Sequence, residues 1–234
     1  MDSHYTYFLI LAASLAGPLA LSFDKKVAFY KSWKYVLPAM ILPAIFYIAW
    51  DIFFTAKQVW SFNDDYITGI HLVNLPIEEV LFFLVVPYCC LFIYACIRAY
   101  FPQLKSNETT RRIWWVLGLS LVFAGLAFYN RYYSSWTFLF CGFFLLIMAL
   151  LQRQFQTFNQ GAFLVSYLII LVPFLLVNGL LTSIPVVLYN DAENLGLRIY
   201  TIPFEDVFYG MLLVLMNVTI YEKLLNASLH TANS

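Results

Sequence analysis

The chain has 234 residues, of which 62% are apolar, 20% aromatic and only 11% charged, and its mean hydropathy is +0.77. Soluble domains carry about 25% charged residues, so this composition excludes a water-soluble globular protein and indicates a membrane protein. The formal net charge is zero and no basic cluster is present, which excludes nucleic acid as a partner.

Seven apolar stretches reach, or nearly reach, the roughly 20 residues that a membrane-spanning helix requires. In chain order they are residues 6–23, 36–54, 77–99, 113–128, 136–151, 163–181 and 204–225. The first has no basic segment before it and no evident cleavage signal, so we expect a retained helix and not a signal peptide. The predicted fold is an all-α membrane protein with about seven transmembrane helices.

Basic residues are divided unevenly between the two ends of these helices. Ten Lys and Arg residues lie in the segments after the first, third and fifth helices and at the end of the seventh, whereas three lie on the opposite side. Because basic loops stay in the cytoplasm, we expect the N-terminus outside the cell membrane and the C-terminus in the cytoplasm.

Two acidic tracts form an internal repeat. Pro76-Ile77-Glu78-Glu79 and Pro203-Phe204-Glu205-Asp206 each open an apolar stretch, and they are 203 − 76 = 127 residues apart. Aligned without gaps at this offset, six of the 18 positions from 63 to 80 are identical, where composition alone would give about one. The chain is therefore predicted to contain two related halves.

This offset maps the fifth, sixth and seventh helices onto the first, second and third. We expect repeat one at about residues 5–100, a connector helix at about 111–130 and repeat two at about 132–227, all in one integral membrane domain. Four crossings precede the fifth helix, so it runs in the same direction as the first and the repeats are parallel. Both acidic tracts then lie at the same side of the membrane and can face one pocket.

The four carboxyl groups of these tracts, Glu78, Glu79, Glu205 and Asp206, are the candidate catalytic residues. Acidic residues in a first helical turn also cap free N–H groups and complement the helix dipole, which could explain one copy. Two copies at equal positions beside a membrane favour a function, because acids there are costly. Desolvation and mutual repulsion would let such a cluster share protons, so that one member donates and another accepts.

Aromatic residues follow each tract by one helical turn. Phe82 and Phe83 follow the first, and Phe208 and Tyr209 follow the second. Aromatic faces stabilise a carbocation without competing as nucleophiles, although aromatic side chains are also ordinary membrane core. Acids beside aromatic faces therefore suit a reaction that forms a carbocation.

Other polar residues at the same side are candidates for a supporting role. Asp51 aligns with Asn178, since 51 + 127 = 178, and His71 aligns with Arg198. The four cysteines lie inside predicted helices, and neither they nor the three histidines have the spacing of a metal site, so no metal is predicted.

The tandem Pro-x-Glu-Glu/Asp tracts, in a membrane protein with two three-helix halves, resemble the membrane-integral lycopene β-cyclases. The resemblance covers essentially the whole chain, and both tracts are intact. It implies that the substrate is lycopene or a related carotenoid taken from the lipid bilayer. The implied reaction is a redox-neutral isomerisation, classed as an intramolecular lyase, that closes an acyclic end into a β-ionone ring.

No cofactor is expected. The lycopene cyclases that resemble flavoproteins use a dinucleotide-binding fold, whereas this chain lacks a Gly-x-Gly-x-x-Gly segment after a strand. From their identical place in both repeats, we expect Glu78 and Glu205 to be the residues most sensitive to substitution, with Glu79 and Asp206 also affected.

Two other functions compete with this interpretation. Asn63-Asp64-Asp65 and Asn190-Asp191 could hold Mg²⁺ and a diphosphate in a membrane prenyltransferase, but neither tract continues with the spaced aspartates such a site needs. A transporter could also use internal repeats, but the predicted helices lack an evident polar path through the membrane.

Overall fold

The computed structural model describes residues 3–151 and 154–232. Within these residues the chain forms seven α-helices, and each overlaps one apolar stretch expected from the sequence. They are α1 Thr6–Leu21, α2 Trp33–Ala56, α3 Ile77–Tyr100, α4 Glu108–Ala127, α5 Tyr132–Leu150, α6 Gln160–Ser183 and α7 Asp206–Ala232. The predicted all-α membrane fold is confirmed.

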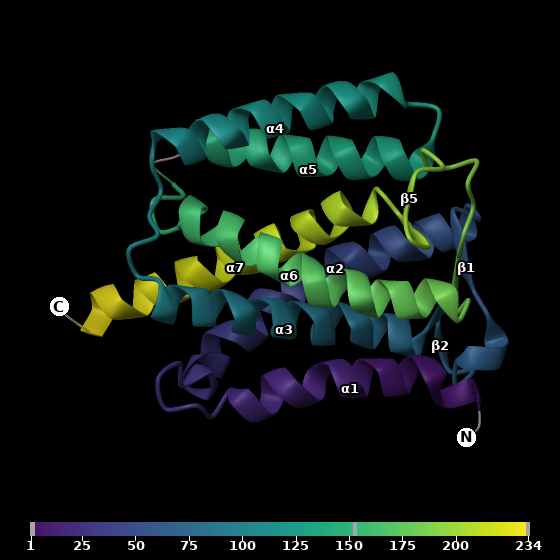
Figure 1. Cartoon of the computed structure of the whole chain (residues 1–234), viewed down its shortest axis with the longest axis horizontal. Coiled ribbons are helices and arrows are strands. Elements are labelled where there is room, and N and C mark those ends of the chain that lie inside the picture. The colour runs from purple at the N-terminus through teal and green to yellow at the C-terminus, as the bar shows by residue number, and fades with distance from the viewer. Residues whose placement is uncertain (1–2, 152–153, 233–234) are drawn as a thin grey trace.

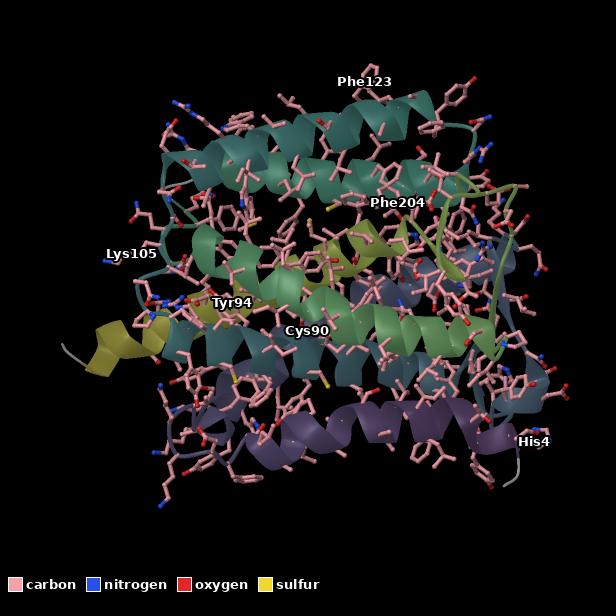
Figure 2. All side chains as sticks on the ribbon, in the orientation of Figure 1. His4, Cys90, Tyr94, Lys105, Phe123 and Phe204 are labelled. Atoms are coloured by element: carbon pink, nitrogen blue, oxygen red, sulfur yellow. The ribbon has the colours of Figure 1, made fainter. Side chains whose placement is uncertain are left out.

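Six of these helices, among the described residues, are long and apolar enough to cross a membrane. The helix left out is α4, which begins with Glu108, Arg111 and Arg112 and is therefore less apolar over its length. It nevertheless lies alongside α5 in the same bundle (Figure 1). Its Phe123 is 76% exposed and points away from the other helices, as a lipid-facing side chain would (Figure 2).

The helices pack side by side, with charged and polar side chains gathered at the two ends of the bundle (Figure 2). Lipid offers no hydrogen bonds to the backbone, so a spanning segment must satisfy its own N–H and C=O groups as a helix. Polar residues cap helices at the ends, as where the Asn159 side chain accepts from the N–H of Ala162 at the start of α6.

Short strands lie between the helices at one end of the bundle (Figure 1). Antiparallel pairs are formed by β1 Trp60–Phe62 with β4 Val187–Tyr189, by β2 His71–Leu72 with β3 Leu75–Pro76, and by β5 Arg198–Ile199 with β6 Ile202–Pro203. The last two hairpins are 198 − 71 = 127 residues apart. Gly69 and Gly196, at the same offset, both have the positive φ that glycine tolerates best.

The β1–β4 pair joins the two halves of the chain. Ser61 lies opposite its own counterpart Leu188, since 61 + 127 = 188, and the residues on either side of Ser61 each lie opposite the counterpart of the other. Antiparallel pairing of a segment with its own equivalent is the arrangement that a twofold axis produces. The axis lies between these two residues, at the end of the bundle that carries both acidic tracts.

The helices follow the same correspondence. The bounds of α2 and α6 differ by 160 − 33 = 127 and 183 − 56 = 127 residues, and α1 and α5 both run away from the strand-bearing end (Figure 1). We propose on this basis the division expected from the sequence: repeat one at about 5–100, connector at about 111–130 and repeat two at about 132–227.

Candidate functional site

Glu78 and Glu205 are fully buried at the strand-bearing end, and each holds the loop that precedes its helix. Glu78 Oε1 accepts from the N–H of Thr68 at 2.8 Å, and Glu205 Oε1 accepts from the N–H of Leu195 at 2.7 Å. These bonds are equivalent in the two repeats. The Ser134 hydroxyl also donates to Glu205 at 2.5 Å. Both residues therefore act at least partly as acceptors that fix the loops.

Glu79 and Asp206 face a different way and line one small pocket, together with Asp51. Each repeat contributes one acid, from the start of α3 and of α7. All three carboxyl groups are at most 9% exposed. The sequence predicted that acids from the two tracts would share one pocket, and Glu79 and Asp206 do so. The member of each tract that reaches the pocket is the second, not the first.

Hydrogen bonds to the two facing acids differ. Glu79 accepts from the hydroxyl of Tyr7 at 2.5 Å. Asp206 accepts from three side chains, namely the hydroxyls of Tyr133 and Tyr189, the latter at 3.1 Å, and the amide of Asn178 at 3.2 Å. Asp206 is consequently held by more donors than its counterpart.

Tyr7 and Tyr133 are repeat equivalents that the sequence comparison missed. They are 133 − 7 = 126 residues apart, whereas the acids they contact are 206 − 79 = 127 apart. An alignment at 127 without gaps sets Tyr7 against Ser134 and conceals the match. Allowing a one-residue shift between α1 and α5 would have found the pair.

The expected supporting pair Asp51 and Asn178 does lie at the pocket. Asn178 donates to Asp206, as described above. Asp51 is 1% exposed, and its Oδ2 atom has no hydrogen-bond partner among the described residues. The two halves therefore present different groups at equivalent places, an acid in one and an amide in the other.

Two of the four expected aromatic residues line the pocket. Phe82 and Tyr209 do so and are repeat equivalents, since 82 + 127 = 209. Phe83 lies behind them in the core against Tyr47, with ring centroids 5.5 Å apart. Phe208 does not line the pocket and packs on Phe138 at 5.5 Å.

Further aromatic residues enclose the same space. Trp60 and Phe62 of β1 and Tyr189 of β4 close the end of the pocket beneath the strand pair. Tyr133 and Tyr189 stack with ring centroids 5.7 Å apart. These residues were not singled out from the sequence, because one residue in five of the chain is aromatic.

His71 and Arg198 lie outside the pocket, on the exposed strands β2 and β5. His71 contacts the carbonyl of Gly69 at 3.0 Å through its Nδ1 atom. Arg198 pairs with Asp191, and this bond holds the pKa of the Asp191 carboxyl below its usual value. The structure assigns neither residue to the acid cluster.

The electrostatic setting of the pocket follows from what lines it. Three carboxyl groups are present and none of the lining residues is Lys, Arg or His. Carboxyl groups buried together without a cation cannot all carry a charge, because desolvation and repulsion both oppose it. Burial raises the pKa of Tyr189 well above its ordinary value, so this residue remains a neutral donor to Asp206. The pocket can hold and move protons.

The two Asn-Asp tracts are used in building turns. The Asn63 side chain accepts from the N–H of Asp65 at 3.0 Å, and the Asn190 side chain accepts from that of Ala192 at 3.1 Å. In the part of the chain that the structure describes, no group of three or more His, Cys, Asp or Glu residues is arranged to hold a metal ion.

Comparison with known families gives a match over most of the chain. The family model described as lycopene cyclase matches this chain twice, at residues 4–97 and at residues 130–224. The starts of the two matches are 130 − 4 = 126 residues apart and their ends 224 − 97 = 127, the same one-residue shift that separates the tyrosines from the acids. Searches of curated proteins and of solved structures returned no match.

Proposed function

The chain belongs to the lycopene cyclase family, and from this premise we propose that it is a lycopene β-cyclase that closes acyclic carotenoid ends into β-ionone rings. Family membership makes its substrates carotenoids and its setting a membrane. The observation that carries the proposal is the joint pocket of Glu79 and Asp206, one acid from each repeat, enclosed by aromatic rings and free of lining cations.

We assign the two acids opposite roles. Asp206 accepts three hydrogen bonds, which favour its charged form, whereas Glu79 accepts one and shares the pocket with Asp51. Glu79 is thus the general acid that protonates the terminal double bond of the substrate. Asp206 is the base that removes a proton once the ring has formed.

Between these steps the substrate is a carbocation. The terminal double bond accepts the proton, the internal double bond attacks the resulting cation, and a C–H bond of the new ring then gives up its proton. No electrons leave or enter the substrate. The aromatic faces of Phe82, Tyr209 and Trp60 would stabilise the cation, and the small pocket would exclude water that could capture it.

The pocket would lie towards the outer side of the cell membrane. This placement is supported by the excess of basic residues at the opposite end of the bundle, which the positive-inside rule assigns to the cytoplasm. A fluorescent reporter that folds only in the cytoplasm, fused to the C-terminus, should therefore be bright. A dark reporter would show that this end is exported and would contradict the proposed orientation.

The first experiment is expression in a host that accumulates lycopene, followed by pigment analysis and by assay of purified protein in lipid nanodiscs. We expect cyclic carotenes to form without added flavin, nicotinamide or divalent metal, because the reaction is redox-neutral and starts from a proton. The Asp206→Asn variant, which we expect to fold and to lose activity, is assayed beside it.

A folded protein that leaves lycopene unchanged in both assays would refute the proposal. Transport without conversion would indicate a carrier. Loss of activity on chelation, restored by Mg²⁺ together with a prenyl diphosphate, would support the prenyltransferase alternative.

A further inference from the structure

A groove of about 600 Å³ lies between α1, α3 and α6. Helices α1 and α6 both pack on α3 but approach each other little, which leaves the space open. Leu9, Leu176 and Leu180 line it and are 40%, 65% and 40% exposed, so the groove opens towards lipid. Helices α4 and α5 lie at the opposite side of the bundle from α1 (Figure 1).

The groove is effectively apolar although it contains some polar residues. The Ser14 hydroxyl donates to the carbonyl of Ile10 at 2.7 Å, and the Thr6 hydroxyl to that of Ser3 at 2.6 Å. The Cys89 thiol donates to the Ser14 carbonyl at 3.5 Å. Because these donors already bond to backbone carbonyls, they need no hydrogen-bond acceptor from a ligand. The groove therefore suits a hydrocarbon.

The groove adjoins the acid pocket. Phe174 and Asn178 line both, and Asn178 donates to Asp206. The Phe174 ring sits against Gly210 of α7, where an added Cβ would lie 2.6 Å from the ring, so glycine is needed for this close contact. A ligand in the groove could thus reach the acids with one end.

The acid pocket alone is too small for the substrate. Its cavity is about 40 Å³, whereas an engineered apolar cavity that binds benzene measures about 150 Å³. The end of a carotenoid must therefore draw on the adjoining space. The groove supplies it, with a volume in the usual range of small-molecule sites, about 300–1,000 Å³.

The equivalent position in the other half, between α5, α7 and α2, is filled. The helix correspondences of 126 residues for α1 and α5 and 127 for α2 and α6 relate four groove residues to four large aromatic ones. The pairs are Ile10 with Trp136, Ser14 with Phe140, Pro173 with Phe46, and Val177 with Trp50.

These four aromatic side chains pack on one another. Phe140 lies 5.1 Å from Trp50, 5.6 Å from Trp136 and 5.8 Å from Phe46 between ring centroids. Such contacts stabilise a core by about 0.5–1.5 kcal/mol per pair beyond the burial of area. The second half thus fills with rings the place that the first half leaves open.

We propose that the groove between α1, α3 and α6 binds the polyene chain of the carotenoid, and that of the two repeat-related positions it alone admits substrate. This inference rests on the proposed function. The groove runs along α1 from Thr6 to Pro18, about 18 Å at ~1.5 Å per residue. A carotenoid as long as the roughly 30 Å membrane core would place one end and about half of its chain there.

The test introduces into the open groove the aromatic residues that fill the equivalent position in the other half. Ser14→Phe and Val177→Trp each install the residue found at the equivalent position, singly and together. Matched controls place the same bulk on lipid-facing positions outside the groove: Ala12→Phe on α1, and Val172→Trp on α6, where the native side chain is 71% exposed. Gel filtration and thermal unfolding in nanodiscs establish that each variant is folded.

Two quantities are measured, namely turnover of lycopene and its binding, read from the circular dichroism that a chiral site induces in the visible band of the pigment. We expect each groove variant to lose about tenfold or more in both, and each control to stay within about twofold. If the double variant does not fold, the single variants decide.

The possible failures are distinguishable. Lycopene bound in a groove-dependent manner but never converted would refute the proposed function and leave the groove in place. If the groove variants convert lycopene as well as the controls do, the proposal that the groove binds substrate is refuted. Intact turnover with loss of co-purified phospholipid would also refute it and would assign the groove to a lipid acyl chain.

Discussion

The neighbouring acids of each tract have different surroundings because successive side chains on a helix point about 100° apart. Glu78 and Glu205 point towards the loops and accept backbone N–H groups, whereas Glu79 and Asp206 line the pocket. The identical glutamates stood out in the sequence. The pocket is instead lined by the second acid of each tract, which we propose to be the catalytic one.

We expect Glu79→Gln and Asp206→Asn each to lower turnover about a hundredfold or more, the usual scale of general acid–base catalysis. Each change removes a proton site while keeping nearly the same shape. Turnover of lycopene by purified protein in nanodiscs is the measurement. Asp191→Asn is the matched control, because Asp191 is an exposed carboxylate at the same end that pairs with Arg198 outside the pocket.

Near-normal turnover in either pocket variant would return that acid to a structural role. Equal losses in the pocket variants and in Asp191→Asn would point to a general effect of charge at this end of the protein.

At the scale of elements, the hairpins β2–β3 and β5–β6 position both tracts. Each hairpin leads into its helix, directly for α3 and after two residues for α7, and in both repeats a glutamate at the helix start accepts from a backbone N–H ten residues earlier. The β1–β4 pair then holds the two helix starts together across the twofold axis. The loops are thus part of the site and not only connections.

Substitutions at Glu205 should separate its hydrogen bond to the preceding loop from any role in catalysis. Glutamine keeps an oxygen that can accept from the N–H of Leu195, whereas alanine leaves that N–H and the Ser134 hydroxyl without their acceptor. We expect Glu205→Ala to lower the free energy of unfolding by about 1–3 kcal/mol and Glu205→Gln by clearly less.

Unfolding of both variants in nanodiscs would be compared with that of Glu108→Ala, which removes an exposed acid at the opposite end. Equal stability of the alanine and glutamine variants at position 205 would contradict a stabilising role for the hydrogen bonds that Glu205 accepts. Full stability of the glutamine variant with a hundredfold loss of turnover would restore Glu205 as a catalytic acid.

At the scale of the whole molecule, the two ends of the bundle differ. The acid cluster lies at the strand-bearing end. At the other end the buried Glu222 pairs with Arg98 and accepts from Tyr94 at 2.8 Å, which joins α7 to α3. Glu222 has no acidic counterpart, since 222 − 127 = 95 and residue 95 is alanine. Among the described residues the acid pocket thus lies at one end of the bundle, and on our proposal a single open groove leads to it.

This asymmetry predicts that the two ends of lycopene are cyclised in separate binding events. A carotenoid as long as the roughly 30 Å membrane core has its far end well away from the acids, so it must leave and turn before the second ring forms. We expect monocyclic γ-carotene to appear before β-carotene, and added lycopene to raise its share. The measurement is a time course of pigments with purified protein. Formation of β-carotene without a monocyclic lag, unaffected by added lycopene, would require a second site.

Much of this architecture could be predicted because it depends on local patterns. Hydropathy along the chain determines where helices form in lipid, and counting the crossings places both acidic tracts at one end. The repeat predicted that an acid from each half would meet at a shared pocket. Asp51 and Asn178 were also found by this reasoning, since they are repeat equivalents near the same end.

Other residues of the site could not be found in this way. Tyr7 and Tyr133 were concealed by a one-residue shift between the repeats, and Tyr189 and Trp60 were concealed by the abundance of aromatic residues. His71, which the alignment made a candidate, faces outward because it lies on an exposed strand.

The sequence by itself determined the membrane setting, the helices, the repeat and the position of the acidic tracts, because each of these depends on short stretches of residues. Only the tertiary structure decided which acid of each tract faces the pocket and which of two equivalent grooves is open. Those outcomes depend on contacts between residues far apart in the chain, such as Tyr7 with Glu79 or Phe46 with Phe140. Hydropathy and spacing do not record how such side chains fill space against one another.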